Sequence, residues 1–212
     1  VKRMVTAVRL IEELFSLSKV NEGELIVNLD PSWLAEFGYP SVLPPGYMDA
    51  FRAAADKIGA ILMSIELPSS VVAGRNTIHE KAPEVEDLMT KADLIINGPL
   101  YSTAHNEALK SGTRSIFIGN PLGAQLRMFP TDELKLLSIA CGEIIEKAKK
   151  IRVTSEAGTD ITCDKTGRKA HAQRGRADEL GRWDNTAAGY VACAPLEDSL
   201  NGTLVIPAGL GS

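Results

Sequence analysis

The chain has 212 residues, of which 44% are hydrophobic and 24% are charged, and its net charge of −4 gives a pI near 5.5. A chain of this length can bury a sizeable core in one large domain or in one and a half. The acidic balance gives no reason to expect nucleic acid or an anionic membrane as a partner. No apolar run of about 18 residues occurs, so we expect neither a membrane span nor a signal peptide.

The three cysteines, Cys141, Cys163 and Cys193, are odd in number and widely spaced, with no C-x-x-C pair. This pattern argues against a disulfide framework and against a zinc knuckle. We therefore expect a reducing, cytoplasmic setting.

The first part of the chain alternates between helical and strand patterns. Apolar residues at roughly helical spacing predict a helix over 4–18, and "ELIVNLD" predicts a strand over 24–30. Further helices are expected from about Tyr47, over 82–92 and over 104–112, and further strands over 61–68, 93–98 and 113–121. Continuous apolar strands between amphipathic helices are typical of a parallel sheet that is covered on both faces. We predict a doubly wound, mostly parallel α/β domain over 1–150.

The pattern changes after a long helical stretch over 131–150. The segment "KIRVTSEAGTDITCDKTGRKAHAQ" alternates polar and apolar residues between glycines, as half-exposed antiparallel strands do. We predict a second, β-rich domain over 151–212. Strand signals continue almost to Ser212, so we expect this domain to be completed by a neighbouring subunit or by a longer chain.

The loop "NGPLYSTAH" directly follows the strand predicted over 93–98. In an open α/β sheet, ligands lie outside the carboxyl ends of the strands, which is where Tyr101, Ser102 and His105 are expected. His105 suits a general base, because the ordinary pKa of a histidine is about 6.5. The structural alternative is that Ser102 caps the following helix and that His105 lies on its first turn.

A second group of candidates is basic. His171 lies in a segment that also holds Arg168, Arg174, Arg176 and Arg182. Clustered basic residues usually form a solvated face, but a guanidinium also matches the two oxygens of a carboxylate substrate. Both interpretations stay open for Arg182 and His171.

Several common catalytic motifs do not occur. The sequence has no G-x-G-x-x-G, no G-K-[ST], no G-x-S-x-G and no H-E-x-x-H. It also offers no compact set of two histidines and a carboxylate, so no complete iron or zinc site can be identified from these residues.

Three segments, "ADLIINGP…YSTAHNEALKSGTR", "AKKIRVTSEAGTDITCDKTGR" and "AAGYVACAPLEDSLNGTLVI", carry a family resemblance over Glu24 to Ile206. The chain resembles the leucyl aminopeptidase family of thermophilic metalloproteases, and within it the 2,5-dihydroxypyridine 5,6-dioxygenase branch. The resemblance implies an α/β N-terminal domain followed by a C-terminal domain that holds the metal. Most of that metal-bearing domain is expected beyond Ser212.

Two short motifs distinguish the branches. The aminopeptidases have a Gly-Glu pair in which the glutamate binds metal, whereas this chain has Gly189 and Tyr190. "GRWD" at 181–184 resembles the ring-cleaving branch instead, which implies one Fe(II) ion with open positions for substrate and dioxygen. The metal ligands implied by the resemblance lie beyond Ser212, so none is assigned to a numbered position.

We therefore expect an extradiol-type dioxygenase that opens a hydroxylated pyridine or a similar ring. His105 is the expected base, with Tyr101 or Ser102 as helper. Trp183 is expected to stack on the ring and Arg182 to orient it, although Trp183 also suits core packing and Asp184 a turn. The alternatives are a zinc- or cobalt-dependent aminopeptidase of the same family and a truncated, non-catalytic α/β binding module. The expected partners are an aromatic substrate, dioxygen and further copies of the same chain.

Overall fold

The structure, a computed structural model, describes residues 2–30, 46–67, 82–97, 102–186 and 188–206. The chain divides into two compact units. Unit 1 comprises Val1–Thr131 and Arg174–Ala188, and unit 2 comprises Asp132–Gln173 and Gly189–Ser212. This division differs from the predicted domains 1–150 and 151–212, because the helix before 150 groups with unit 2 and the segment 174–188 returns to unit 1.

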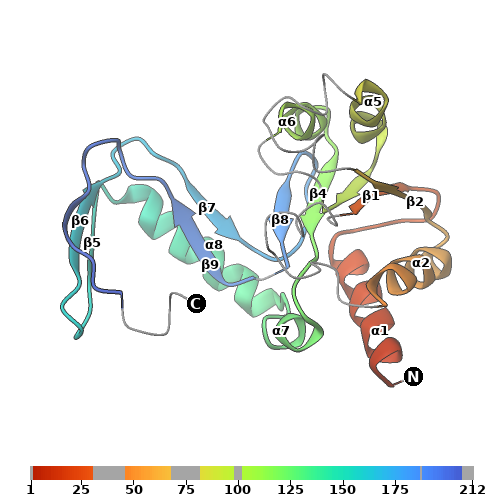
Figure 1. Cartoon of the computed structure of the whole chain (residues 1–212), viewed down its shortest axis with the longest axis horizontal. Coiled ribbons are helices and arrows are strands. Elements are labelled where there is room, and N and C mark those ends of the chain that lie inside the picture. The colour runs from red at the N-terminus through yellow and green to blue at the C-terminus, as the bar shows by residue number, and fades with distance from the viewer. Residues whose placement is uncertain (1, 31–45, 68–81, 98–101, 187, 207–212) are drawn as a thin grey trace. The chain divides into compact units, whose positions relative to one another are not determined.

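Unit 1 is built on a five-stranded sheet (Figure 1). Its strands are β1 (Leu25–Asp30), β2 (Ile61–Glu66), β3 (Leu94–Ile96), β4 (Arg114–Phe117) and β8 (Trp183–Asn185). The order across the sheet is β2-β1-β3-β4-β8, and every neighbouring pair is parallel. The predicted α/β class with a mostly parallel sheet is confirmed.

Helices cover both faces of this sheet. They are α1 (Lys2–Leu17), α2 (Tyr47–Ile58), α5 (Pro83–Lys91), α6 (Thr103–Lys110) and α7 (Leu122–Arg127). Figure 1 shows α1 and α2 on one face and α5 and α6 on the other. None of the helices in the described ranges is long and apolar enough to cross a membrane.

The central position of β3 explains why all three of its residues are hydrophobic. Leu94 and Ile96 pack in the core beneath α1 and α2, whereas Ile95 packs in the second core beneath α5 and α6. Successive side chains of a strand point to opposite faces, so a strand in the middle of a two-sided sheet needs apolar residues at every position.

Arg114 joins the elements at the amino ends of the strands. Its side chain is buried and donates hydrogen bonds to the carbonyl oxygens of Ser18 and Lys19, which follow α1. It also donates to the carbonyl oxygen of Asp93 at 3.2 Å and pairs with the carboxylate of Glu24 at 2.5 Å. The guanidinium thus satisfies carbonyl groups beyond the end of a helix and ties α1, β1 and β3 to β4.

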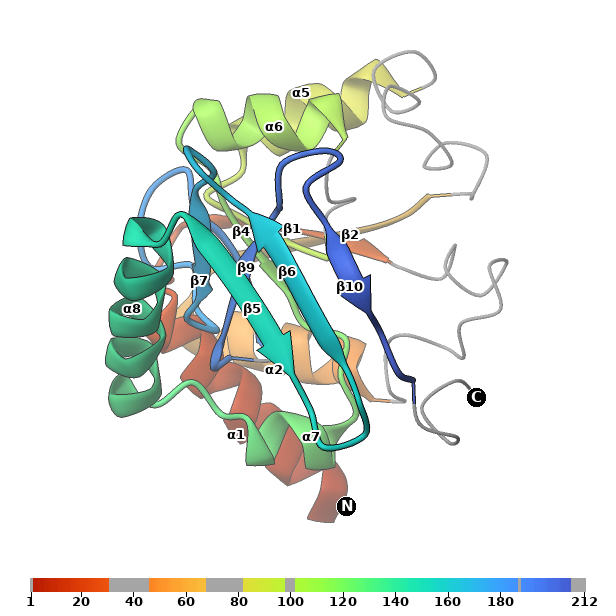
Figure 2. The same cartoon turned by 90° about the vertical axis from the view of Figure 1, so that its left-hand side faces the viewer.

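Unit 2 contains one long helix and two small antiparallel sheets (Figure 2). The helix is α8 (Asp132–Lys147), one sheet has the order β10-β6-β5 and the other pairs β7 with β9. The strands are β5 (Lys150–Thr154), β6 (Asp160–Asp164), β7 (Ala170–Gln173), β9 (Tyr190–Cys193) and β10 (Asn201–Thr203). The predicted β-rich character of this part of the chain is confirmed.

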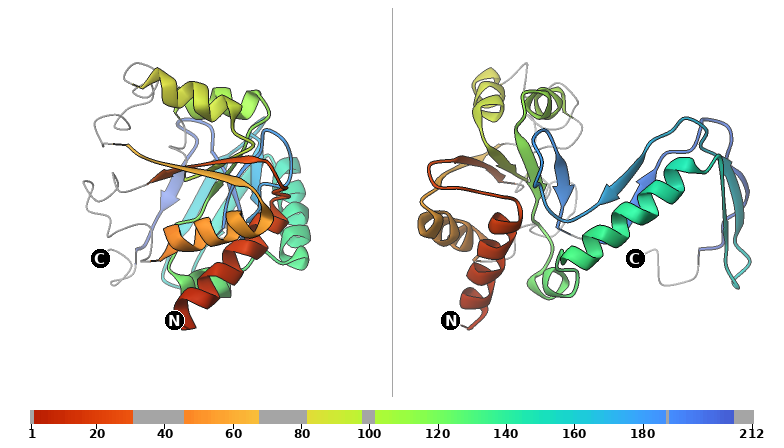
Figure 3. Two further views of the ribbon diagram at one scale, coloured as in Figure 1. Left: turned by 90° about the vertical axis from the view of Figure 1, so that its right-hand side faces the viewer. Right: turned by 180° about the vertical axis from the view of Figure 1, so that it is seen from behind.

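Small residues bring α8 onto β7, and the helix runs alongside β7 and β9 in Figure 3. A Cβ atom at Gly142 would lie 3.1 Å from the Cβ atom of Ala172. At the end of the helix, the buried Lys165 side chain donates to the carbonyl oxygens of Glu146 at 3.3 Å and Ala148 at 3.1 Å. A cation at this position also interacts favourably with the negative end of the helix dipole.

We expect Arg114→Lys to lower the free energy of unfolding by about 2–3 kcal/mol, because a single ammonium group cannot bond the carbonyl groups and Glu24 together. Urea denaturation followed by circular dichroism measures this change. Arg152→Lys is the matched control, because Arg152 forms an exposed pair with Asp160, and we expect it to leave unfolding nearly unchanged. Equal effects of the two substitutions would contradict the role given to Arg114.

Candidate active site at the carboxyl ends of the strands

The strand order of unit 1 changes direction between β1 and β3. From β1 the chain continues to β2 on one side, and β3 then pairs on the other side of β1. In open α/β sheets, ligands bind outside the carboxyl ends of the strands at such a switch point. The carboxyl ends of β1 and β3 are therefore the candidate site, which we call the switch point.

Buried amide groups connect the strands at the switch point. Asn28 of β1 and Asn97, directly after β3, are both fully buried. The Nδ2 atom of Asn97 donates to Oδ1 of Asn28 at 3.4 Å, and Nδ2 of Asn28 donates to the hydroxyl of Ser64 on β2 at 3.0 Å. The Oδ1 atom of Asn97 accepts from the backbone N–H of Ile118 at 2.8 Å. These bonds run from β2 to the end of β4 and fix the spacing of the strands where a ligand would bind.

Asn97 also has an unusual backbone. Its φ of 57° lies in the left-handed region, which asparagine tolerates better than most residues other than glycine. Its N–H still donates to the carbonyl oxygen of Ile116 at 2.9 Å. Asn97 therefore ends β3 and turns the chain at the start of the predicted catalytic loop.

Ser102 caps the helix that follows this loop. Its hydroxyl accepts a hydrogen bond from the backbone N–H of His105 at 3.0 Å, at the start of α6. This is the structural alternative considered for Ser102 from the sequence, and it leaves the catalytic role a prediction. Tyr101 lies outside the described residues.

His105 points into unit 1. The side chain is 1% exposed, and its Nε2 atom lies 2.9 Å from the hydroxyl of Ser115 on β4. Burial lowers the pKa of His105 to about 4, because the charged imidazolium would lose its hydration. At neutral pH the ring is uncharged, and its role as a base stays a prediction.

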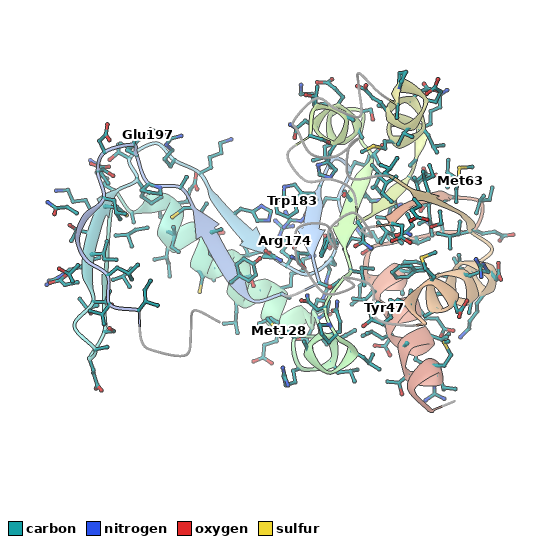
Figure 4. All side chains as sticks on the ribbon, in the orientation of Figure 1. Tyr47, Met63, Met128, Arg174, Trp183 and Glu197 are labelled. Carbon is teal, nitrogen blue, oxygen red and sulfur yellow. The ribbon has the colours of Figure 1, made fainter. Side chains whose placement is uncertain are left out.

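Trp183 lies next to this pair on the neighbouring strand. The register of the parallel strands places Trp183 of β8 opposite Ser115 of β4, and the N–H of Ser115 donates to the carbonyl oxygen of Arg182 at 2.8 Å. Figure 4 labels Trp183 on β8, where its side chain is half-buried. Two separate candidates thus adjoin Ser115, His105 through a hydrogen bond and Trp183 through strand pairing.

Arg182 and Asp184 pair with each other. The carboxylate of Asp184 is fully buried and accepts from Nη2 of Arg182 at 2.7 Å and from Nε at 3.1 Å. It also accepts from the backbone N–H groups of Arg174 and Gly175, each at 3.1 Å. The pair therefore holds the segment that leads into β8, and direct substrate contact by either residue stays a prediction.

Close packing around Gly175, in the segment that leads to β8, leaves no room for a side chain at this position. Its φ is 76°, and a Cβ atom there would lie 2.6 Å from the Cβ atoms of Ala188 and Pro130.

His171, the remaining sequence candidate, lies on β7 of unit 2, opposite Ala192. The described candidates of unit 1 are therefore Ser102, His105, Arg182, Trp183 and Asp184.

Sequence reasoning missed three polar residues of this region. Asn28 and Asn97 were included in predicted strands, although an asparagine within or directly after an apolar strand is itself a signal of a buried polar site. Tyr47 is also buried, and its hydroxyl donates to the carbonyl oxygen of Asn120 at 3.2 Å. Burial raises the pKa of Tyr47 to about 12, so the phenol stays protonated and remains a donor.

A cavity of about 520 Å³ lies at the other end of the strands. Residues at or just before the amino ends of β1, β3 and β4 line it, among them Glu24, Asp93 and Arg114. These side chains already serve the fold, since Arg114 pairs with Glu24, and Asp93 accepts from the N–H of Leu25 at 2.8 Å. We therefore place the candidate site at the carboxyl ends of the strands rather than in this cavity.

The residues that the structure describes do not form a metal site. No group of three or more histidine, cysteine, aspartate or glutamate side chains among them could hold an ion. The individual candidates agree with this, because His105 bonds Ser115 and Asp184 pairs with Arg182. The described residues therefore do not fit a resident metal ion.

The fold and its polar switch point define a doubly wound α/β protein of the kind that places small ligands at the carboxyl ends of its strands. A sequence profile described as NicX: 2,5-dihydroxypyridine 5,6-dioxygenase matches residues 6–210. The chain therefore belongs to the 2,5-dihydroxypyridine 5,6-dioxygenase family. The comparisons do not support the wider expectation of membership in the leucyl aminopeptidase family.

Two comparisons agree with this assignment. The chain is 27% identical over 218 residues to a 2,5-dihydroxypyridine 5,6-dioxygenase of Pseudomonas putida (strain KT2440), covering 95% of this chain and 58% of that protein. The solved structure of 2,5-dihydroxypyridine dioxygenase from Pseudomonas putida KT2440 matches with a TM-score of 0.79 and 26% identity, over 93% of this chain and 58% of that one. The chain thus spans somewhat more than half the length of these relatives.

The lowered pKa of His105 predicts a pH dependence of stability. A histidine whose pKa falls from about 6.5 in the unfolded chain to about 4 in the folded protein contributes stability above pH 6.5 that is lost as the pH falls toward 4. We expect the wild type to lose about 1–2 kcal/mol more than His105→Gln between pH 7.5 and pH 5. Urea denaturation at both pH values measures this, and equal losses would show that His105 is not buried in its neutral form.

We expect Asn97→Ala to lower the free energy of unfolding by about 2–4 kcal/mol, because it leaves the N–H of Ile118 without its acceptor and keeps the left-handed backbone. Asn97→Gly removes the same side chain but adopts that backbone freely, so it should be about 1 kcal/mol more stable than Asn97→Ala. Chemical denaturation of both variants tests the two contributions. A glycine variant no more stable than the alanine variant would argue against strain at this position.

Proposed function

We propose that this chain takes part in ring cleavage of a hydroxylated pyridine, such as 2,5-dihydroxypyridine, by dioxygen. The observation that carries the proposal is the family match over residues 6–210, together with a relative of that name that aligns with 95% of this chain. Because the chain spans 58% of each relative's length, the proposal concerns the activity to which this part contributes.

The groups at the switch point support a ligand of this kind. Asn28 and Asn97 are neutral hydrogen-bonding groups, and no carboxylate or guanidinium takes part in the bonds that join them to Ser64 and Ile118. Amides of this kind suit the hydroxyl groups and ring nitrogen of a dihydroxypyridine. We place the ring outside the carboxyl ends of β1 and β3, beside the start of α6.

His105 is the proposed base, with Tyr101 or Ser102 as helper. Burial keeps the imidazole neutral at pH 7, which is the form that accepts a proton. A pKa of about 4 makes it a weak base, but a partly charged oxygen of the ligand close to the ring would raise that pKa. The hydroxyl of Ser115 at 2.9 Å restricts the orientation of the ring.

Trp183 is the proposed stacking residue. Its position opposite Ser115 supports a place beside His105, and an indole stacks readily on a flat heteroaromatic ring. Arg182 precedes β8 at the amino end of that strand, where it pairs with Asp184, so its proposed role in orienting the ring rests on the sequence alone. The role of His171, on β7 of unit 2, stays a prediction from the sequence.

We propose ferrous iron as the cofactor, in keeping with the ring-cleaving family. Because the described residues do not fit a metal ion, its ligands are proposed to lie outside them. In this proposal, the side chains of this chain bind the ring and transfer protons.

The activity is tested by measuring oxygen uptake with the full-length protein that carries this chain, 2,5-dihydroxypyridine and added Fe(II). We expect uptake that depends on both additions, together with loss of the ring absorbance. Leucine anilide with Co(II) or Zn(II) is the control reaction, for which we expect no hydrolysis. Ligand binding without uptake would instead support a binding module, and neither binding nor uptake would contradict the proposal.

Binding is measured separately from turnover through tryptophan fluorescence. The chain has two tryptophans, so Trp33→Phe leaves Trp183 as the only one. We expect 2,5-dihydroxypyridine to quench Trp183 in this variant. Adding His105→Gln should lower turnover about 100-fold while changing the dissociation constant by less than about 3-fold. Unchanged turnover would show that His105 is not the base.

A further inference from the structure

Ser115 occupies a rigid position within the sheet of unit 1. It belongs to β4, where it pairs with Ile95 of β3 on one side and with Trp183 of β8 on the other. Its N–H donates to the carbonyl oxygen of Arg182 at 2.8 Å, and its side chain is buried. Because β4 is paired on both sides, the Ser115 hydroxyl is a fixed support for a group that bonds to it.

Strand alternation directs this hydroxyl toward α6. The next residue, Ile116, packs in the core beneath α1 and α2, and successive side chains of a strand point to opposite faces. Ser115 therefore faces the side of α5 and α6, where its hydroxyl lies 2.9 Å from Nε2 of His105. On α6, Ala104 and Ala108 are buried in the apolar core of that side. A hydrogen bond in such low-dielectric surroundings is stronger than one in water.

The other nitrogen of the imidazole, Nδ1, lies nearer to the backbone at the start of α6. His105 belongs to the first turn of this helix, and its backbone N–H donates to the Ser102 hydroxyl. Side chains of a helix lean toward its N-terminus, and Nδ1 is the imidazole nitrogen closer to the main chain. The first N–H groups of a helix carry partial positive charge, and the first turn of α6, as the structure describes it, holds no acidic side chain to offset that charge. A positive potential near Nδ1 favours a lone pair over a proton on that atom.

These two surroundings favour one neutral form of the imidazole. In that form Nε2 carries the proton and donates it to the hydroxyl oxygen of Ser115, while Nδ1 is bare and can accept a proton. The opposite form has Ser115 donating to Nε2 and places an N–H at Nδ1, against the positive end of the helix. Only the first form presents a proton acceptor on the side where α6 begins.

We propose that Ser115 is the positioning residue of His105. By accepting from the N–H at Nε2, it holds the imidazole in the form whose Nδ1 accepts a proton from the bound hydroxypyridine, directly or through one water molecule. The proton leaves a hydroxyl group of the ligand, and its electron pair stays on that oxygen. Nε2 keeps its own proton throughout, so the hydrogen bond to Ser115 persists when the imidazole becomes charged. This inference rests on the proposed ring cleavage and on the proposed role of His105 as its base.

The protonated nitrogen is identified by nitrogen NMR of the imidazole groups in the iron-free, full-length protein that carries this chain, labelled in its histidines. The signals of His105 are those that disappear in His105→Gln. We expect a protonated Nε2 and a bare Nδ1 in the wild type, a measurement that needs no variant of Ser115. A proton on Nδ1 in the wild type would overturn the proposal.

Variants of Ser115 test whether its hydroxyl selects this form. Ser115→Ala should give a mixture of the two neutral forms, whereas Ser115→Thr keeps the hydroxyl and should keep the wild-type signals. Ser18→Ala is the matched control, because it removes another buried serine hydroxyl of unit 1, which accepts from the N–H of Ala177 at 3.2 Å. It should leave the signals of His105 unchanged. Wild-type signals in Ser115→Ala would overturn the proposal.

Turnover of 2,5-dihydroxypyridine by the full-length protein with Fe(II) tests the consequence for proton transfer. Ser115→Ala should lower kcat about 10-fold and change KM by less than about 3-fold, because the ligand still binds while the base is held less well. Ser115→Thr should keep kcat within about 3-fold of the wild type, and Ser18→Ala should leave it nearly unchanged. An unchanged kcat in Ser115→Ala, with an active wild type, would overturn this inference alone. An inactive wild type would instead contradict the proposed ring cleavage on which the inference rests.

Discussion

The arrangement of unit 1 depends on the left-handed turn at Asn97. This one residue ends β3, bonds the amide of Asn28 on β1 and accepts from the N–H of Ile118 after β4. An unsatisfied amide at this depth would cost about 1–3 kcal/mol, so the three strands are held at one spacing by groups that must remain paired. That spacing sets the width of the switch point and the direction in which the chain leaves β3.

The amides of Asn28 and Asn97 are neutral, although Asp30 ends β1 and Glu66 ends β2 nearby. Two ion pairs among the described residues serve the fold, one between Arg114 and Glu24 at the amino ends of the strands and one between Arg182 and Asp184 at the start of β8. His105 is neutral because it is buried, and Tyr47 stays protonated for the same reason. The neutral amides of Asn28 and Asn97 are suited to a small polar ring, which agrees with the proposed substrate.

Unit 2 is organised by a different principle. Its helix contacts β7 through small residues such as Gly142, while Leu136, Leu137 and Ile144 are more than half exposed. Lys165 fixes the end of that helix through backbone carbonyl groups. The unit therefore has a defined backbone, while several of its large apolar side chains are exposed in the part of the chain that the structure describes.

The sequence by itself determined the parallel sheet, since apolar strands such as 94–96 are needed only where both faces are buried. It also indicated the helix cap at Ser102, as one of two interpretations of that residue. Segments such as "GTDITCDKTGR" indicated the family. Only the tertiary structure decided that β8 pairs with β4, because a three-residue strand far along the chain carries too little local signal. Tertiary contacts likewise decided that His105 is buried against Ser115 and that the buried carboxylate of Asp184 accepts from the N–H groups of Arg174 and Gly175. The spacing of residues reports which surface of an element is apolar, but which partner meets a polar side chain depends on segments that only folding brings together.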